Sequence, residues 1–353
     1  MSNNIHEIFS NLTLFYPENK DEVVTGSRVL LRRNFEGYQF AHQLSEEEQN
    51  NIRYLVQKAL ENAGVLDCFE YVDIKDIKDL DILGVAGRST FTNEVVGAFI
   101  NRDDHIAILV NFEDHICMQA TSHGYNLNSM FEKINALDNL IAESIDFAYS
   151  NRLGFLTVFP KNVGTGLTVE VGMHLGALKF VDEIQQILFG LDELGFNLRE
   201  LFDSIESDSS AIGGIVIVSN RRTLGVKEQT VLDNMAVIVD KLKHLEIAAR
   251  ERYFVESTRM VQEQLETFKD ERKSDDLKEF SYLLEIVSFL KLGIDSGVIR
   301  KITYDDIYNI LDKADLSCKL HLGCRNENDK GADVMNIIDN IFEKIELVEY
   351  IDE

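Results

Sequence analysis

The chain has 353 residues, of which 45% are apolar and 27% charged, a balance typical of a globular protein with two or three domains. Its formal net charge of -26 disfavours nucleic acid and anionic membranes as partners. No apolar run approaches the roughly 18 residues of a membrane span, and residues 1–20 lack the basic and apolar regions of a signal peptide, so we expect a cytoplasmic protein.

The N-terminal third mixes helix-like and strand-like segments. Residues 1–20 place apolar side chains on one helical face, and Thr25–Asn34 has the composition of a strand. Ser45 and Glu48 have the spacing of a capping box, which predicts a helix that runs to about Ala63. Two apolar runs around an Arg-Asp-Asp turn then predict a hairpin made of residues 95–104 and 106–112.

The middle of the chain is also mixed. Helical spacing covers residues 129–150 and resumes from Phe180, and residues 227–264 have the pattern of one long helix. Short apolar runs predict strands at residues 155–158, 169–174 and 213–218. Because strands and helices do not alternate regularly, the sequence favours an α+β fold with a mixed or antiparallel sheet covered by helices.

The C-terminal part is predicted to be helical. The polar segment 269–276 is the best candidate for a linker, and helical patterns follow at residues 280–298, 304–310 and 334–345. The four cysteines form no Cys-x-x-Cys pair, so we expect neither a disulfide framework nor a metal site; they are Cys68, Cys117, Cys318 and Cys324.

The stretch Phe159–Thr168 carries the most specific signal. It reads Phe-Pro-Lys-Asn-Val-Gly-Thr-Gly-Leu-Thr and holds one of only two prolines in the chain. Four other segments accompany it in chain order: Gly26-Ser-Arg-Val-Leu30, Asn111-Phe-Glu-Asp-His115, Val218-Ser-Asn220 with Thr223-Leu-Gly225, and Glu246 with Ala249-Arg250. Together they resemble the motifs of guanidino kinases, which transfer phosphate from ATP to arginine, creatine or protein arginine. The spacing is most similar to that of the bacterial protein-arginine kinases.

The resemblance implies a guanidino-kinase fold, related to that of glutamine synthetase, with an antiparallel sheet flanked by helices. We expect a mainly helical N-terminal part at residues 1–80 that includes the Ser-Arg strand, a catalytic domain at residues 81–267, and a C-terminal all-helical dimerisation domain at residues 277–353. The resemblance also implies MgATP as cofactor, protein arginine as substrate, a homodimer, and an adaptor or activator protein as partner.

In this family, arginines clamp the ATP phosphates, a carboxylate holds the acceptor guanidinium, and a Cys lies beside it. Arginine suits the clamp because its planar fork binds phosphate oxygens bidentately. Arg28 and the carboxylate Glu113 are present, and His115 of the same motif is a second catalytic candidate. Other matched positions have lost their chemical groups: Leu30, Cys117 and Thr168 stand for arginines, Phe112 for a second glutamate, and Phe159 for the Cys. The loop matched to the fifth arginine, residues 202–210, has no base but carries Asp203, Glu206 and Asp208.

The missing cations decide the predicted function. One arginine finger contributes about 10³–10⁵ in rate, so the loss of four clamp arginines is expected to cost well over ~10⁶ in turnover even with strong non-additivity. The sequence therefore predicts a pseudokinase that acts by protein binding. Two alternatives stay open: an active protein-arginine kinase with a remodelled ATP pocket, and an acidic scaffold that docks a basic partner.

The retained residues allow two interpretations. By resemblance, the nucleotide-binding residues are Ser27, Arg28, Lys161, Asn162, Gly164, Thr165 and Gly166. Alternatively, the turn persists because it needs positive φ, His115 is structural, and Arg28 pairs with Glu113. Several cations lie near the motifs in the sequence, and they either rebuild the clamp or are surface charges. They are Arg32, Lys161, Arg199, Arg221 and Arg222. Arg32 lies ~13 Å along the strand from Arg28, at about 3.3 Å per residue.

One further family motif concerns phosphoarginine. Protein-arginine kinases read it with an Arg-Asp-x-x-Arg-Ala segment near the C-terminus. The nearest counterpart here is Arg325–Lys330, which has Asn326 at the Asp position and no second Arg. Because a dianion needs two basic groups without competing acids, we do not expect this segment to read phosphoarginine.

Overall fold

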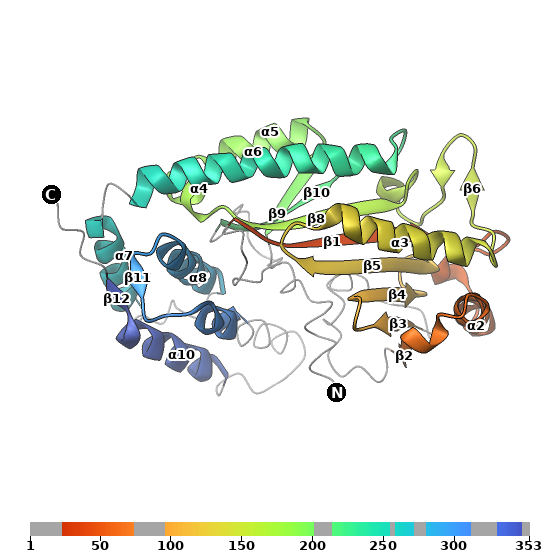
Figure 1. Ribbon diagram of the computed structural model, residues 1–353, viewed down its shortest axis with the longest axis horizontal. Coiled ribbons are helices and arrows are strands. Elements are labelled where there is room, and N and C mark those ends of the chain that lie inside the picture. Colours follow the sequence, from red (N-terminus) through yellow and green to blue (C-terminus); the bar gives the residue numbers. More distant parts are fainter. Residues whose placement is uncertain are drawn as a thin grey trace.

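A computed structural model describes residues 23–73, 96–200, 214–254, 258–271, 280–311 and 330–347. Its main feature is an eight-stranded antiparallel sheet, which confirms the predicted fold class (Figure 1). In spatial order the strands are β2 (Glu70–Asp73), β3 (Gly97–Asn101), β4 (Ile106–Val110), β5 (Ile116–His123), β1 (Val24–Arg33), β8 (Leu167–His174), β10 (Ile215–Asn220) and β9 (Phe196–Glu200).

Strand β1 lies at the centre of this sheet, between β5 and β8, and all ten of its residues are buried. Because β1 has a hydrogen-bonded neighbour on each side and its side chains are buried on both faces, its Val and Leu residues fit this position. The segment predicted as an N-terminal part thus contributes β1 and β2 to the same sheet as the predicted catalytic domain. The boundary at residue 80 lies outside the described residues, and the division into three domains stays a prediction.

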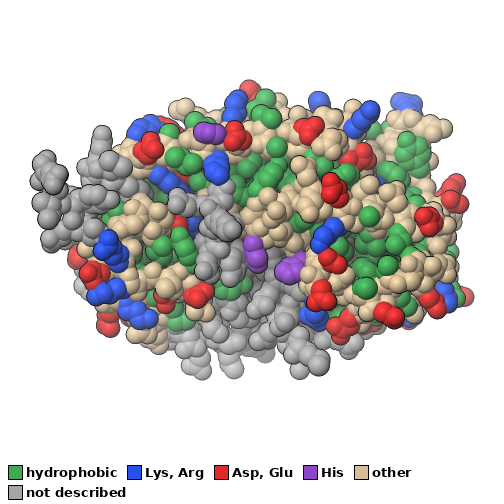
Figure 2. All heavy atoms as spheres, in the orientation of Figure 1, with side chains coloured by type: hydrophobic (Ala, Val, Ile, Leu, Met, Phe, Trp, Pro, Cys, Tyr) green, Lys and Arg blue, Asp and Glu red, His purple; other side chains and the backbone are tan. Residues whose placement is uncertain are grey.

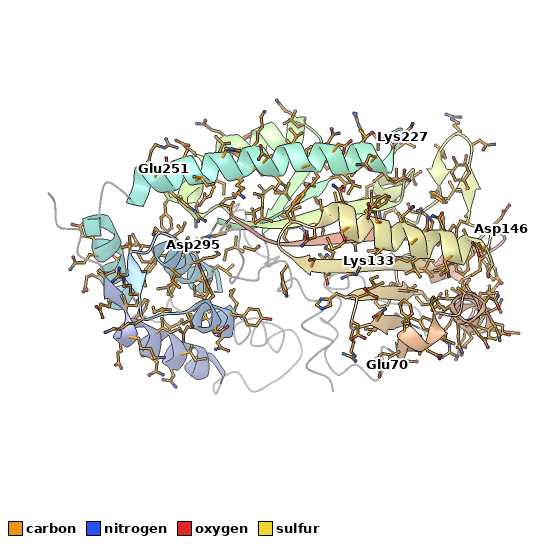
Figure 3. All side chains as sticks on the ribbon, viewed as in Figure 1. Glu70, Lys133, Asp146, Lys227, Glu251 and Asp295 are labelled. Carbon is orange, nitrogen blue, oxygen red and sulfur yellow. The ribbon has the colours of Figure 1, made fainter. Side chains whose placement is uncertain are left out.

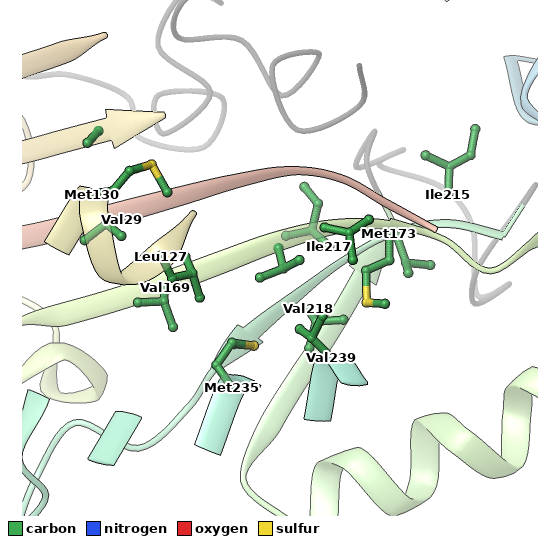
Figure 4. Close-up of a cluster of buried hydrophobic side chains, with 14 of the residues drawn as sticks. Val29, Leu127, Met130, Val169, Met173, Ile215, Ile217, Val218, Met235 and Val239 are labelled. Carbon is green, nitrogen blue, oxygen red and sulfur yellow. The ribbon is translucent and has the colours of Figure 1, made fainter. Parts of the chain in front are cut away.

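One face of the sheet is apolar and is covered by helices. Val29 of β1 and Val169 of β8 are neighbours in register, and they contribute to a buried cluster with Leu127 and Met130 of α3 (Leu127–Ala142) (Figure 4). Farther along the sheet, Met235 of α6 (Glu228–Phe254) joins the same core. Because side chains alternate along a strand, the residues on either side of Val29 in β1 and of Val169 in β8 point to the opposite face of the sheet, which is polar.

The predicted strand, capped helix and hairpin of the N-terminal third are confirmed, whereas the helical pattern of residues 1–20 lies outside the described residues. Helix α2 (Glu46–Asn62) begins at Ser45 with the predicted capping box: the Glu48 amide donates to Ser45 Oγ at 3.3 Å, and the Ser45 amide donates to Glu48 Oε2 at 2.8 Å. The predicted hairpin is formed by β3 and β4. Two short 3₁₀ turns, η2 (Ala41–Gln43) and η3 (Leu66–Cys68), flank α2.

Helix α3 is shorter than predicted. It ends at Ala142, although apolar spacing continued to residue 150. The Ala148 amide donates to the Asn34 carbonyl at 2.8 Å, and Phe147 bridges Phe35, so this segment is extended beside the end of β1. A small hairpin of β6 (Tyr149–Ser150) and β7 (Gly154–Phe155) follows. Ile145 is buried just after the last helical residue, where its amide still donates to the Ile141 carbonyl at 3.0 Å, so apolar spacing alone does not show where the helix ends.

The helix predicted from Phe180 instead begins earlier and has two parts, α4 (Gly176–Phe180) and α5 (Ile184–Glu193). The carboxylate of Glu246, on α6, accepts hydrogen bonds from the amides of Ala177 and Leu178, both at 3.0 Å. These amides are unpaired within the first turn of a helix, so α4 is capped from a distant element. The predicted helix 227–264 is described as α6 and α7 (Thr258–Glu271), with residues 255–257 outside the described residues.

The C-terminal part contains the predicted helices. They are α8 (Phe280–Asp295), a helical segment at residues 304–311, and α10 (Lys330–Lys344). A short antiparallel pair, β11 (Ile299–Arg300) with β12 (Glu346–Leu347), adds an element that the sequence patterns did not indicate. In the part of the chain that the structure describes, none of the helices is both long and apolar enough to span a bilayer.

A buried polar network joins α8 to the helices on the sheet, close to Asp295 (Figure 3). Asp295, whose side chain is 1% exposed, accepts from Lys291 Nζ at 2.7 Å, from Arg250 Nη1 at 3.1 Å and from the Tyr304 hydroxyl at 3.0 Å. Arg250, on α6, also donates to Glu246 Oε1 at 2.9 Å. Two cations and two carboxylates are thus paired at the junction between the sheet layer and the C-terminal helices.

Candidate functional site

The motif residues meet on the polar face of the sheet. Arg28, Leu30 and Arg32 alternate along β1 and point to this face. The register with β8 places Arg28 opposite Glu170 and Leu30 opposite Thr168. Across β5, the partners of Arg28, Leu30 and Arg32 are Thr121, Gln119 and Cys117. The structure therefore brings together four strand positions that the motif resemblance matches to clamp arginines, and only one of them carries an arginine.

Arg28 is held by an acid of the chain itself. Its Nε donates to Glu170 Oε2 at 2.8 Å, and its Nη2 contacts the same oxygen. Arg199, on β9, donates from Nη2 to Glu170 Oε1 at 3.1 Å. Burial alone would raise the pKa of Glu170, but the charges of Arg28 and Arg199 lower it to about 2. Arg28 and Arg199 thus share an internal carboxylate that is ionised at any physiological pH.

This arrangement corrects one expectation, since Arg28 pairs with Glu170 and not with Glu113. The cation near Glu113 is Arg32, whose Nε lies 4.0 Å from Glu113 Oε2. Burial raises the pKa of Glu113, and Arg32 only partly offsets this. Sequence reasoning treated Arg32 as distant because it considered separation along one strand; the lateral neighbours across the sheet are what bring it to the site.

Arg32 contacts positions that the motif resemblance matches to arginines. Its Nη1 donates to Thr168 Oγ1 at 2.8 Å, and its backbone lies opposite Cys117. Burial raises the pKa of Cys117 to about 11, so its thiol stays protonated and is not a nucleophile. Phe112 is 5% exposed and belongs to the buried apolar residues. Arg32 is therefore the one clamp-like cation at these replaced positions among the described residues.

The side chains of the two residues that follow Glu113 form hydrogen bonds with backbone groups. His115 accepts at Nδ1 from the Phe35 amide at 2.9 Å, and its Nε2 lies 2.7 Å from the Gln39 carbonyl. Burial lowers the pKa of His115 to about 4, so the ring is neutral at physiological pH. Asp114 accepts at Oδ1 from Asn34 Nδ2 at 2.6 Å and from the Val158 amide at 2.8 Å. These contacts favour the structural interpretation of His115.

The Gly-Thr-Gly turn has structural reasons to exist. It follows a 3₁₀ turn, η6 (Pro160–Asn162), and Gly164 and Gly166 have φ of +117° and +68°. A Cβ on Gly166 would lie 2.6 Å from the Arg32 carbonyl oxygen, so only glycine fits there. Arg33 also stabilises the turn. Its Nη1 donates to the Thr165 carbonyl at 2.8 Å, and its Nη2 donates to Asp138 Oδ2 at 2.8 Å. Folding constraints alone can therefore account for the retained glycines.

The remaining predicted residues divide between buried and exposed positions. Ser27 donates to the Gly124 carbonyl at 2.6 Å and accepts from the Asn126 amide at 3.1 Å, so it fixes the turn into α3. Asn162 is buried, whereas Lys161 is exposed, with its Nζ 5.7 Å from the centre of the Phe159 ring. Phe159 itself is 40% exposed. The aromatic ring and Lys161 thus stand at the edge of the site, and Phe159 is the residue that the resemblance matches to a Cys.

Sequence patterns missed two residues of this face. Glu170 was not singled out, because only the register of β8 with β1 shows that it meets Arg28. Gln119, on β5, is fully buried, and neither polar atom of its amide finds a hydrogen-bond partner within the described structure. The acidic loop 202–210 and most of Arg325–Lys330 lie outside the described residues. Within those residues, no group of three or more His, Cys, Asp or Glu side chains is placed to bind a metal ion.

Comparisons with known proteins agree with the fold and the motifs. Residues 37–249 match the family model described as ATP:guanido phosphotransferase, C-terminal catalytic domain. The chain is similar to the protein-arginine kinase of Clostridium tetani, with 29% identity over 86% of this chain and 87% of the relative, and to that of Clostridium acetobutylicum, with 28% identity over 82% and 87%.

Solved structures with a similar fold include two kinases. The substrate-free duplicated taurocyamine kinase from Schistosoma mansoni has a TM-score of 0.53 and 25% identity, over 67% of this chain and 35% of that longer one. Lombricine kinase has a TM-score of 0.54 at 20% identity, over 68% of this chain and 70% of that one, a likeness that concerns the fold alone.

Proposed function

Because the chain belongs to the ATP:guanido phosphotransferase family, we propose that it is a protein-arginine kinase homologue that has lost efficient phosphoryl transfer and acts by binding other proteins. The observation that carries the proposal is the Glu170 carboxylate between Arg28 and Arg199. A phosphate that approached these arginines would compete with an ionised internal acid. We infer the pseudokinase state because the Glu170 carboxylate already neutralises the two arginines that a phosphate would contact.

MgATP does not fit the charges of the site. A triphosphate needs several cations at fixed positions, and each preorganised donor contributes about 2.7–4 kcal/mol to the transition state. Here Leu30, Cys117 and Thr168 offer no positive charge, and Arg28 is already paired. Among the described residues, Arg32 is the remaining buried cation on this face, and Glu113 lies beside it. We therefore derive no reaction step through the nucleotide.

Isothermal titration of the full chain with MgATP tests the proposal. We expect no binding in the micromolar range, because the neutralised arginines cannot compensate the charge of the phosphates. A matched titration of an active protein-arginine kinase is the control. A micromolar dissociation constant for this chain would contradict the proposed loss of function.

One observation favours a second candidate, a working kinase with a remodelled pocket. Arg32 donates to Thr168 and lies near Glu113, so a single arginine reaches the region of two lost ones. In this alternative, protein arginine is the acceptor and Glu113 holds its guanidinium. Transfer of labelled phosphate from ATP to an arginine-rich protein, abolished in the variant Glu113→Gln, would support it. Absence of labelling under conditions where an active relative labels the same protein would exclude it.

The protein-binding role includes specific partners by family resemblance. We propose a homodimer formed through the C-terminal helices and an adaptor or activator protein as the second partner. Both proposals rest on the relationship to protein-arginine kinases and not on a contact within this chain. Sedimentation analysis of the purified chain tests the homodimer.

A further inference from the structure

Three segments meet next to the Gly-Thr-Gly turn at one end of the molecule. The Phe155 amide donates to the Gly164 carbonyl at 2.8 Å, which ties the β6–β7 hairpin to the turn. On the other side of Gly164, the Thr165 amide donates to the Thr223 carbonyl at 3.1 Å. A Cβ on Gly154 would lie 2.6 Å from the Gly164 carbonyl oxygen, so the backbones touch. The hairpin, the turn and the segment before α6 therefore lie side by side (Figure 1).

This surface exposes large apolar side chains. Tyr149 and Leu153, on the hairpin, are 57% and 40% exposed, and Leu224, beside the turn, is 50% exposed. The Tyr149 ring packs at 5.2 Å on Phe155, which fixes its position. Single exposed apolar residues are common, but several on adjoining rigid segments indicate a surface that another molecule covers.

The same surface carries cations that the chain does not neutralise. Arg152, Arg222 and Lys227 are exposed, and none has an ion-pair partner in the ranges that the structure describes. The chain as a whole has 61 acidic and 35 basic residues, so a local excess of bases departs from its average. Figure 2 shows Lys, Arg, Asp and Glu side chains beside apolar ones at this upper right end, and Figure 3 places Lys227 at the start of α6. Nearby, Arg221 pairs with Asp192, and Asp146 lies at the base of the hairpin.

We propose that this surface, which we call the hairpin patch, docks an acidic segment of a partner protein that also carries aromatic or aliphatic side chains. The patch consists of Tyr149, Arg152, Leu153, Arg222, Leu224 and Lys227. Acidic side chains of the partner would meet its three cations, and apolar ones would cover Tyr149, Leu153 and Leu224. The inference deepens the proposed function, on which it rests, because it gives a protein-binding chain a defined surface and a partner chemistry.

Charge and shape favour an acidic peptide over other occupants. A nucleic acid would bring phosphates well beyond the three cations of the patch, toward a protein of net charge -26. A second copy is proposed to bind through the C-terminal helices, which are not part of the patch. A short acidic segment carries little charge outside its contact and can use the apolar residues as well. Tyr and Arg are also the side chains that most often dominate binding energy at interfaces.

The patch adjoins the candidate site. Phe159 and Lys161 belong to the loop that contains Gly164, and Thr223 Oγ1 donates to the Lys161 and Val163 carbonyls, both at 2.8 Å. A partner bound on the patch would therefore lie against the edge of the site. The hairpin patch and the loop that contains Gly164 are thus linked by the same hydrogen bonds.

The test measures binding of fluorescent peptides of equal length to the full chain by anisotropy, without nucleotide. A peptide of alternating Glu and Phe is the probe, and peptides of Glu with Ser and of Lys with Phe are its controls. We expect the Glu-Phe peptide to bind at least about tenfold more tightly than either control, because only it satisfies both the cations and the apolar residues. Arg152→Glu and Arg222→Glu should each weaken its binding about fivefold.

Matched variants separate the patch from general effects. Lys241→Glu makes the same charge change on the exposed side of α6 and should leave the affinity of the peptide unchanged. Leu224→Ser should weaken binding about fivefold, whereas Val237→Ser, at a residue 60% exposed on α6, should not.

Several results would overturn the inference. They are equal binding of the three peptides, equal effects of Arg222→Glu and Lys241→Glu, equal binding of a thymidine oligonucleotide, or self-association of the chain that Arg222→Glu abolishes. The last two would identify a general polyanion surface or a second copy as the occupant. None of these results depends on the MgATP titration, so failure of the docking inference and failure of the proposed loss of phosphoryl transfer remain distinguishable.

Discussion

The variant Glu170→Gln is expected to unfold about 3 kcal/mol more easily than the wild-type chain, because it leaves Arg28 buried without the carboxylate that neutralises it. Arg28 is 1% exposed, so water cannot solvate its guanidinium in place of the lost carboxylate. Arg199 loses the same partner, although its side chain is partly exposed and contributes less. Chemical denaturation followed by circular dichroism measures the difference.

The pH dependence of that difference is a second readout of the same variant. The pKa of Glu170 is lowered from 4.5 to about 2 in the folded chain, so its stabilising charge is fully present above pH 4.5 and is lost as pH falls toward 2. The gap between wild type and Glu170→Gln should therefore shrink through this window. Glu113→Gln, on the same face, is the control: the pKa of Glu113 is raised by burial, so its neutralisation should cost no stability. Equal losses of stability in the two variants would show that the Glu170 carboxylate contributes no more to the stability of the fold than Glu113 does.

The variant Asp295→Asn is expected to lose about 3–5 kcal/mol of stability, because one carboxylate there serves both Lys291 and Arg250 inside the protein. The asparagine keeps the shape of the side chain and removes only its charge. Since Arg250 lies on α6 and Asp295 on α8, the loss should also loosen the C-terminal helices from the sheet layer. Limited proteolysis is then expected to cleave between these parts sooner than in the wild type.

A matched control for this variant is Glu285→Gln. Glu285 also joins α8 to the sheet layer, through Lys179 at 2.6 Å, but both side chains are partly exposed. Surface ion pairs contribute about 0–1 kcal/mol, so this change should have little effect on denaturation or proteolysis. A comparable loss in both variants would mean that the buried network contributes nothing beyond an ordinary surface contact.

Local chemistry made much of the fold predictable. The capping box of Ser45 and Glu48 uses residues three apart, and the hairpin of β3 and β4 uses adjacent strands, so both were visible in the sequence. The prediction for helix α3 is too long because Ile145 is buried in the turn that follows the helix and so continues its apolar spacing. Helix α4 is capped by Glu246, far away in the sequence, and no local pattern could indicate its start.

The candidate site was predictable in its positions but not in its contacts. Motif matching singled out Arg28, Leu30, Cys117 and Thr168, and the register of β1, β5 and β8 brings these four positions together. It did not find Glu170, because the partner of Arg28 depends on strand register across 142 residues of sequence separation. For the same reason Arg32 was taken as remote from the clamp although its side chain reaches Thr168. Contacts between strands that are distant in the chain carry the information that motifs lack.

The most direct measurement for the central claim is a crystal structure of the chain grown with MgATP. We predict no ordered triphosphate on the polar face of the sheet, with Glu170 still paired to Arg28 and Arg199. Well-ordered phosphates held by three or more Lys or Arg side chains, with Glu170 displaced, would contradict the account.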